Sequence, residues 1–157
     1  MGLPIDPLRK LASGLLLHDL GKVEIPGEIL RKRGPLTPEE WTIMRRHPKL
    51  GVHLLSTDLV APEVATVVHQ HHENVCGGGY PQDLTGESIH QFAKLAKVAD
   101  VFDALTTRRS YKGALPSFPA LHMMQTEMRA CFDGRILREL VLMLRASEDE
   151  QDEAQAA

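Results

Sequence analysis

Residues 89–106 read IHQFAKLAKVADVFDALT, and this stretch decides the fold class. Its apolar residues recur three or four positions apart, which is the spacing of one face of an α-helix. The residues on that face are Ile89, Phe92, Ala96 and Ala99. Asp100 lies beside the face, so the predicted helix carries a carboxylate next to its apolar side. The stretch lacks the alternation of apolar and polar residues that is typical of a β-strand.

The same periodicity, together with helix start and stop signals, predicts helices on both sides of this stretch. They cover about residues 6–20, 37–47, 49–56, 62–72, 117–130 and 134–145. In TPEEW, Thr37 and Glu40 have the spacing of a capping box. No convincing strand pattern occurs, so we predict an all-α fold of about six to seven helices. We assign Leu15, Trp41 and Phe92 to its core.

Composition fits one helical domain. The chain has 157 residues, of which 43% are hydrophobic and only 4% aromatic, which favours helices over a β-sandwich. The segment 147–157 holds five of the 21 acids and no base, and the rest has 16 acids against 18 bases. We therefore predict a domain at 1–146 and a disordered acidic tail at 147–157. No basic block argues for DNA binding.

Cysteine usage and hydropathy indicate the compartment. The two cysteines, Cys76 and Cys131, form no CxxC motif, which is typical of a reducing cytoplasm. No apolar run approaches the length of a membrane span. We expect a cytoplasmic protein without a membrane segment.

Histidines and aspartates gather at the ends of the predicted helices. Together with the aspartate inside 89–106, they form a set of six: His18, Asp19, His47, His71, His72 and Asp100. Imidazole and carboxylate together suit iron, manganese or zinc. Two such ions about 3.5–4 Å apart can activate water and stabilise a phosphoryl displacement. A single histidine is more often structural, so spacing alone leaves the metal site and the structural interpretation equally open.

Three segments together resemble one family. They are LLLHDLGKVEIPGEILRKRGPLTPEEWTIMRRHPKLG at 15–51, HHENVCGGGYP at 71–81 and AKLAKVADVFDALTTRRSYK at 93–112. These resemble the HD-GYP family, a branch of the HD superfamily of metal-dependent phosphohydrolases, over roughly residues 8–145. The resemblance implies an HD-superfamily helical bundle and a bacterial cyclic di-GMP phosphodiesterase that produces pGpG or GMP. It also implies two or three divalent ions, iron or manganese, and a longer parent protein with a receiver or sensor domain.

The resemblance also assigns roles to residues. It implies that the six residues above are the metal ligands, and that Asp19 and Lys22 are catalytic, with Lys22 meeting a phosphate or the attacking water. The substrate-binding residues it implies are Gly79, Tyr80, Pro81, Arg109 and Lys112. Tyr80 is expected to stack on a guanine. The family also uses the glycine-rich loop to meet diguanylate cyclase domains.

The sequence departs from the family pattern at three places, one of which is Arg108 and Ser110, where the family usually has an aspartate and a proline. Family members carry a further histidine ligand on an upstream helix, and this chain has no histidine before His18. We therefore expect an HD-GYP domain without its usual upstream helices, weakly active or inactive when isolated. Leu8, Leu11 and Leu15 would then be free to pair in a homodimer. Cys76 stands where the family usually has an aspartate.

Three hypotheses follow. The first is the phosphodiesterase. The second is a catalytically impaired module that binds cyclic di-GMP or a cyclase domain as a scaffold. The third is a phosphohydrolase for another nucleotide, such as a cyclic GMP-AMP dinucleotide.

Overall fold

The computed structural model describes residues 4–55, 59–108 and 113–156, and within these ranges it contains helices and no strand. The α-helices are α1 Ile5–Leu17, α2 Gly27–Leu30, α3 Pro38–Met44, α4 His47–Leu54, α5 Pro62–Gln70, α6 Gln91–Thr106, α7 Ser117–Thr126 and α8 Gly134–Ala156. Helix α2 is a single turn, so seven described helices are longer than one turn. The predicted all-α class and helix number are confirmed.

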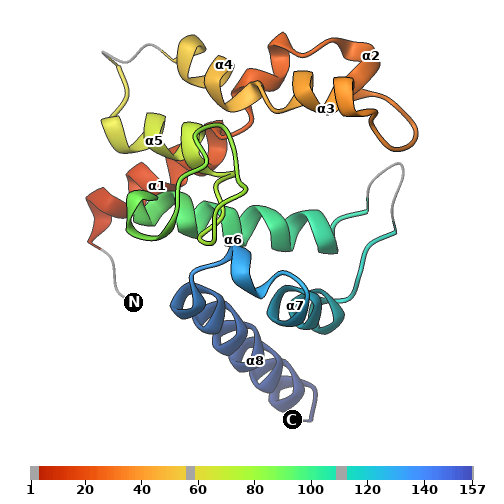
Figure 1. Ribbon diagram of the computed structural model, residues 1–157. Coiled ribbons are helices and arrows are strands. Elements are labelled where there is room, and N and C mark those ends of the chain that lie inside the picture. The colour runs from red at the N-terminus through yellow and green to blue at the C-terminus, as the bar shows by residue number, and fades with distance from the viewer. Residues whose placement is uncertain (1–3, 56–58, 109–112, 157) are drawn as a thin grey trace.

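Helix α6 is the centre of the molecule. Helices α1 and α5 pack against one side of it, and α7 and α8 pack against the other (Figure 1). Helix α4 packs against α5 and against the 3₁₀ turn Leu20–Glu24 that follows α1. The chain thereby brings the end of α1, the start of α4 and the end of α5 to one side of α6.

The largest apolar cluster lies between α6 and the two C-terminal helices. Its buried members are Val98, Leu105, Ala120, Met124, Phe132, Ile136 and Leu137. Met124 is fully buried, and truncating such a side chain to alanine costs about 2–5 kcal/mol. This cluster fixes α6 against α7 and α8 and leaves the opposite side of α6 to carry Asp100.

The prediction of which α6 residues are buried is partly wrong. Ile89 and Ala96 are buried as expected, but Ala99 is exposed, while Val98 and Leu105 are buried. The reason is that α6 is covered from two directions. A central helix buries residues around much of its circumference, and a single apolar stripe does not describe it.

Two helix boundaries and one core assignment also differ from the sequence analysis. His47 begins α4 and does not end the preceding helix, because Pro48 is well tolerated in a first helical turn. Trp41 is 45% exposed, so its assignment to the core was wrong. The capping box of Thr37 and Glu40 at the start of α3 is confirmed.

Helix α8 is longer than predicted. It continues to Ala156, through the acidic segment for which the sequence predicted disorder. Glutamate, glutamine and alanine are good helix formers, and neither glycine nor proline follows Gly134 to stop the helix. The end of the domain at residue 146 stays a prediction.

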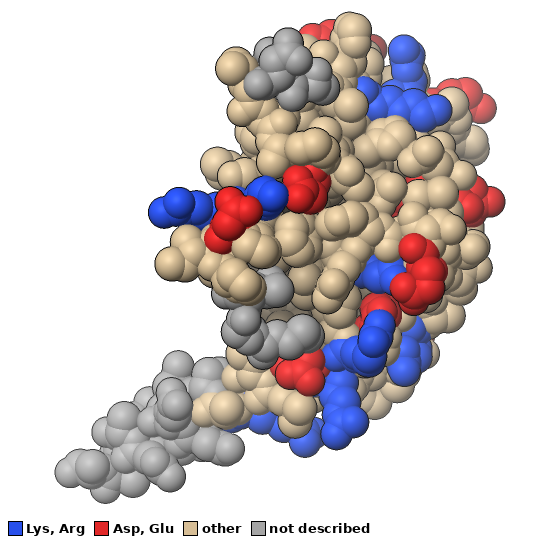
Figure 2. Space-filling view, turned by 90° about the vertical axis from the view of Figure 1, so that its left-hand side faces the viewer, with Lys and Arg blue, Asp and Glu red and all other residues tan. Residues whose placement is uncertain are grey.

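Charges are mixed over the face of the molecule drawn in Figure 2. On the face in Figure 2, basic and acidic side chains are interspersed over the described part of the chain. Within the same part, no helix combines the length and the apolar character that crossing a membrane requires.

Candidate metal centre and adjoining pocket

The six predicted ligands come together in space although they lie up to 82 positions apart, from 18 to 100. One ligand atom from each of Asp19, His47, His71 and His72 lies within 4.8 Å of the others. His18 joins them through Asp19, because its Nε2 lies 3.3 Å from Asp19 Oδ2. Its Nε2 also lies 3.8 Å from Oδ1 of Asp100 on α6. The geometry that a shared site requires is therefore present.

Three of the histidines are each held by the backbone that directly precedes them. In His18, His47 and His71, the Nδ1 atom faces the backbone carbonyl three residues earlier, at 2.6, 2.8 and 2.9 Å. A carbonyl oxygen only accepts hydrogen bonds, so Nδ1 carries the proton in each ring. This leaves Nε2 of His47 and of His71 as a free lone pair, whereas Nε2 of His18 faces the Asp19 carboxylate and hydrogen-bonds to it when protonated. Metal-binding histidines are usually oriented in this way.

These free lone pairs face one another. Nε2 of His47 lies 3.3 Å from Nε2 of His71, and both atoms are acceptors in this tautomer. Asp19 Oδ1 is buried, lies 3.5 Å from His47 Nε2 and has no hydrogen-bond donor. Three acceptors that point at one position need a cation between them. Metal–nitrogen bonds of about 2.1 Å place adjacent ligands about 3–3.5 Å apart, so the donor set fits a divalent transition metal.

Asp19 divides its two oxygens between two groups of ligands. Oδ1 faces His47, while Oδ2 faces His18 and accepts a hydrogen bond of 2.6 Å from Lys22 Nζ. One carboxylate between two ligand sets is suited to bridging two ions. Lys22 therefore lies at the centre, as the sequence predicted, with its ammonium on Asp19.

The electrostatics favour the metal-binding forms of His47, His71, His72 and Asp19, and they act the other way on His18. Burial lowers the pKa of His71 to about 3, and burial likewise lowers the pKa values of His72 and His47. These imidazoles are neutral at pH 7, which ligation requires. Burial alone would raise the pKa of Asp19, but hydrogen bonds from His18 and Lys22 outweigh it and lower that pKa. The hydrogen bond to Asp19 raises the pKa of His18.

A close backbone approach positions His47. A Cβ atom at Gly21 would collide with the carbonyl oxygen of His47. Only glycine allows the turn after Asp19 to lie directly against the start of α4. The HDLG sequence thus brings Asp19 and His47 together by backbone packing.

Glu73 organises what we call the GYP loop, residues 73–84. Its buried carboxylate accepts hydrogen bonds from the backbone N–H groups of Gln82 and Leu84, at 2.7 and 2.9 Å. A Cβ atom at Gly79 would lie 2.6 Å from the Cα of Glu73, so the loop folds back onto its own start. Tyr80 and Pro81 are thereby fixed beside the histidines.

Tyr80 does not have both ring faces free. Its ring stacks on His72, with centroids 4.5 Å apart and an interplanar angle of 24°. The Arg45 guanidinium carbon lies 5.5 Å from the Tyr80 centroid and 5.9 Å from that of Trp41. Burial raises the pKa of Tyr80, so its hydroxyl stays protonated. The predicted guanine stacking by Tyr80 stays a prediction.

An open pocket of about 850 Å³ adjoins the histidines. His47, His72, Tyr80 and Lys22 form its inner part, and Trp41 lies on its wall. This volume is typical of small-molecule sites. A ligand in the pocket would meet the metal centre on one side and an exposed aromatic ring on the other.

Sequence reasoning missed Glu73, Trp41 and Arg45. For Glu73 the signal was its place directly after the paired histidines. For Trp41 and Arg45 the signal was their spacing of one helical turn, which lets a cationic side chain reach an aromatic ring. The predicted residues Arg109 and Lys112 lie outside the described residues.

The sequence matches the HD domain family over residues 2–136. The chain belongs to this family, and its histidine–aspartate and Gly-Tyr-Pro motifs place it in the HD-GYP branch. The family implies divalent metal binding.

Curated relatives agree with this family. The chain is 38% identical over 143 residues to "Cyclic di-GMP phosphodiesterase response regulator RpfG" of Xanthomonas campestris pv. campestris, covering 90% of this chain and 38% of that protein. It is 40% identical over 138 residues to "Cyclic di-GMP phosphodiesterase PA4108" of Pseudomonas aeruginosa, covering 87% and 33%. It is 46% identical over 101 residues to "3'3'-cGAMP-specific phosphodiesterase 2" of Vibrio cholerae, covering 61% and 19%. The chain therefore spans well under half of each relative.

A solved structure shares the fold. Bd1817, a HDG"Y"P protein from Bdellovibrio bacteriovorus, superposes with a TM-score of 0.73 at 22% identity, covering 89% of this chain and 44% of that one.

Proposed function

We propose that this chain is the catalytic domain of a cyclic di-GMP phosphodiesterase, which hydrolyses the dinucleotide to pGpG or GMP. The observation that carries the proposal is the buried Asp19 Oδ1, which lacks a donor and faces His47 beside a pocket of about 850 Å³. The names of the curated relatives support the same activity and favour it over a scaffold without catalysis.

The ions would be two divalent metals: the mixed imidazole and carboxylate ligands suit iron, manganese or zinc, and the resemblance to the HD-GYP family favours iron or manganese. His47, His71 and His72 with Asp19 would hold one, and His18, Asp19 and Asp100 the other. Bound there, the metals supply Lewis-acid chemistry that activates water and neutralises phosphoryl oxygens. The fixed Nδ1–H bonds keep the ligands aligned, so reorganisation during the reaction is small.

Lys22 and Asp19 form the reacting end of the pocket. The Lys22 ammonium already pairs with Asp19 Oδ2, and it also lines the pocket. A phosphate entering from that side would therefore meet a positive charge at the metal edge. Lys22 orients the phosphate or the attacking water through its hydrogen bonds.

Trp41, Arg45 and Tyr80 would hold a nucleobase. Trp41 exposes an aromatic ring toward the pocket, and the exposed Arg45 lies between the two aromatic side chains. Base stacking on an aromatic ring contributes about 1–3 kcal/mol. Arg109 and Lys112 are proposed to contact phosphate or guanine from the segment that precedes α7.

The other partners belong to the same proposal. A diguanylate cyclase domain would dock on the GYP loop, and a receiver or sensor domain would regulate the parent protein. A homodimer would pair through α1, where Leu8 is exposed, Leu11 and Leu15 are half-buried, and Ile5 and Leu16 add exposed apolar area. The cytoplasm would be the compartment.

A second substrate is supported by a specific observation. Three relatives are named 3'3'-cGAMP-specific phosphodiesterases, at 46%, 31% and 33% identity. Equal enzyme samples given cyclic di-GMP or 3'3'-cGAMP separate the two activities by their kcat/KM values. At least a tenfold preference identifies the substrate.

The central experiment loads the protein anaerobically with Mn²⁺ or Fe²⁺ and follows cyclic di-GMP by chromatography. We expect pGpG to form, metal content near two ions per chain, and both to fall in His71→Ala. His53→Gln, which changes an exposed histidine, is the matched control. Full metal loading with nucleotide bound and no product would overturn the proposal.

A further inference from the structure

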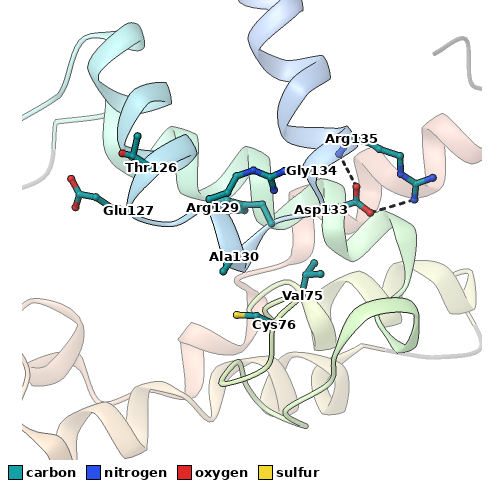
Figure 3. A pocket seen from close by; sticks show the side chains of 10 residues that line it. Val75, Cys76, Thr126, Glu127, Arg129, Ala130, Asp133, Gly134 and Arg135 are labelled. Atoms are coloured by element: carbon teal, nitrogen blue, oxygen red, sulfur yellow. Dashed lines mark hydrogen bonds and ion pairs between the residues drawn. The ribbon is translucent and has the colours of Figure 1, made fainter.

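The two cysteines, 55 positions apart in sequence, are neighbours in the fold. The backbone N–H of Val75 donates a 3.1 Å hydrogen bond to the carbonyl of Cys131. Cys76 is the next residue along the GYP loop, and Cys131 ends the 3₁₀ turn Arg129–Cys131 between α7 and α8. The backbones are thus tied together one residue from Cys76. Figure 3 shows Val75 and Cys76 beside Ala130, which precedes Cys131.

The Cys76 thiol hydrogen-bonds to the Gly77 carbonyl in this structure and lies near enough to Cys131 to act on it electrostatically. Burial and the neighbouring Cys76 thiol both raise the pKa of the Cys131 thiol. Both cysteines are free, Cys76 is exposed and Cys131 is half-buried. Cys76 lines an open cavity of about 860 Å³, which gives a small oxidant access to its sulfur. An exposed thiol beside a partly covered one is the arrangement of an attacked and a resolving cysteine.

From this geometry we propose that Cys76 and Cys131 form a reversible disulfide, which makes the pair an oxidation-sensitive modification site on the GYP loop. The oxidant is a hydroperoxide. The Cys76 thiolate attacks one peroxide oxygen, the O–O bond breaks, and Cys76 becomes a sulfenic acid while water is released. The Cys131 thiolate then attacks the Cys76 sulfur, an S–S bond forms, and hydroxide leaves and takes up the thiol proton. Two thiols and one hydrogen peroxide thus give one disulfide and two waters.

The consequence concerns the loop. Cys76 lies between Glu73, which anchors the loop, and Tyr80, which faces the histidines. A disulfide would join this loop covalently to the α7–α8 connection and restrict its movement relative to that connection. A dithiol reductant would release it. This inference is independent of which nucleotide the chain hydrolyses.

The test uses the whole chain, freed of metal with a chelator so that peroxide chemistry at iron does not interfere. After treatment with hydrogen peroxide, non-reducing peptide mapping by mass spectrometry should find the Cys76 peptide joined to the Cys131 peptide in the monomer fraction. The midpoint of thermal unfolding should rise by several degrees, because the bond closes a long chain segment. Dithiothreitol should reverse both effects.

Single variants separate the cysteine that peroxide oxidises from the cysteine that resolves the sulfenic acid. In Cys131→Ser, Cys76 should accumulate a sulfenic acid that dimedone labels, and no internal disulfide should form. In Cys76→Ser, Cys131 should react with peroxide more slowly than Cys76 does in Cys131→Ser. Overoxidised Cys76 with Cys131 still alkylatable in the unsubstituted chain would overturn the proposal. Disulfides found only between chains would overturn it as well.

Discussion

The histidine–aspartate cluster and the pocket beside it are built in different ways. In the cluster, His18, His47 and His71 are each fixed by a carbonyl three residues earlier in the same segment. At the pocket, Trp41 and Tyr80 are both lining residues, and the exposed Arg45 approaches Tyr80 only through the tertiary fold. Ligand orientation is thus a local property, whereas substrate contact is a property of the assembled helices. Substitutions should therefore abolish function in the cluster and adjust it in the pocket.

The largest effect is expected for Asp19→Asn. The substitution removes the negative charge that faces both His18 and His47, so the side chain no longer links the two groups of ligands. Metal content and phosphodiesterase turnover should both fall at least about 100-fold, since even outer partners of metal ligands contribute 10–100-fold. Elemental mass spectrometry and product chromatography measure these losses. Glu28→Gln, an exposed carboxylate change, should leave both values unchanged.

Acid should destabilise the metal-free protein next most strongly. Burial lowers the pKa values of His47, His71 and His72 in the fold, to about 3 for His71, whereas unfolded histidine titrates near 6.5. Below about pH 6.5 the unfolded chain therefore binds more protons than the folded one. The free energy of unfolding should fall by about 1–3 kcal/mol per pH unit as the pH is lowered from 6.5 toward 4.5.

His18 does not change this sign. Its raised pKa contributes stability that is complete below about pH 6.5 and is lost only as the pH rises through the folded value. Asp19 contributes further loss only below about pH 4, where its unfolded form takes up a proton. Urea unfolding between pH 7.5 and 4.5 tests the prediction. A flat profile across this range would contradict it.

Glu73→Gln should weaken the GYP loop, which joins the histidine–aspartate cluster to the pocket. The amide can present only one oxygen to the N–H groups of Gln82 and Leu84, and its NH₂ group then faces a donor. We expect a loss of about 1–3 kcal/mol in the free energy of unfolding. The exposed Glu87→Gln should cost much less. Equal losses in the two variants, measured by urea denaturation, would show that the loop does not depend on Glu73.

The smallest effect is expected in the pocket. Trp41→Leu should raise KM for cyclic di-GMP about tenfold and leave kcat within about twofold, because stacking holds substrate and transition state alike. Trp41→Phe should retain most of the affinity. The chain contains one tryptophan, so its fluorescence reports binding directly. A nucleotide that binds without changing this fluorescence would place the base elsewhere.

Much of the site could be predicted from residue types and spacing. The six predicted ligands stand at helix ends or on a helix face, and the family motif points to them without knowledge of the packing. Trp41 shows the limit of this reasoning. A large aromatic residue beside a capping box predicts a core position, yet α3 lies at the edge of the molecule and leaves the ring 45% exposed.

The sequence by itself determined the helices, the six ligand candidates and the glycines that permit close backbone contact. These depend on neighbours within about four residues and on chemical type. Only the tertiary structure decided that Asp19 Oδ1 is left without a donor, that Tyr80 stacks on His72 and that the segment holding Cys76 lies beside Cys131. The physical reason is that these arrangements depend on how loops and separate elements pack, beyond the reach of one helical turn. They form only when α1, α4, α5 and α7 have packed around α6.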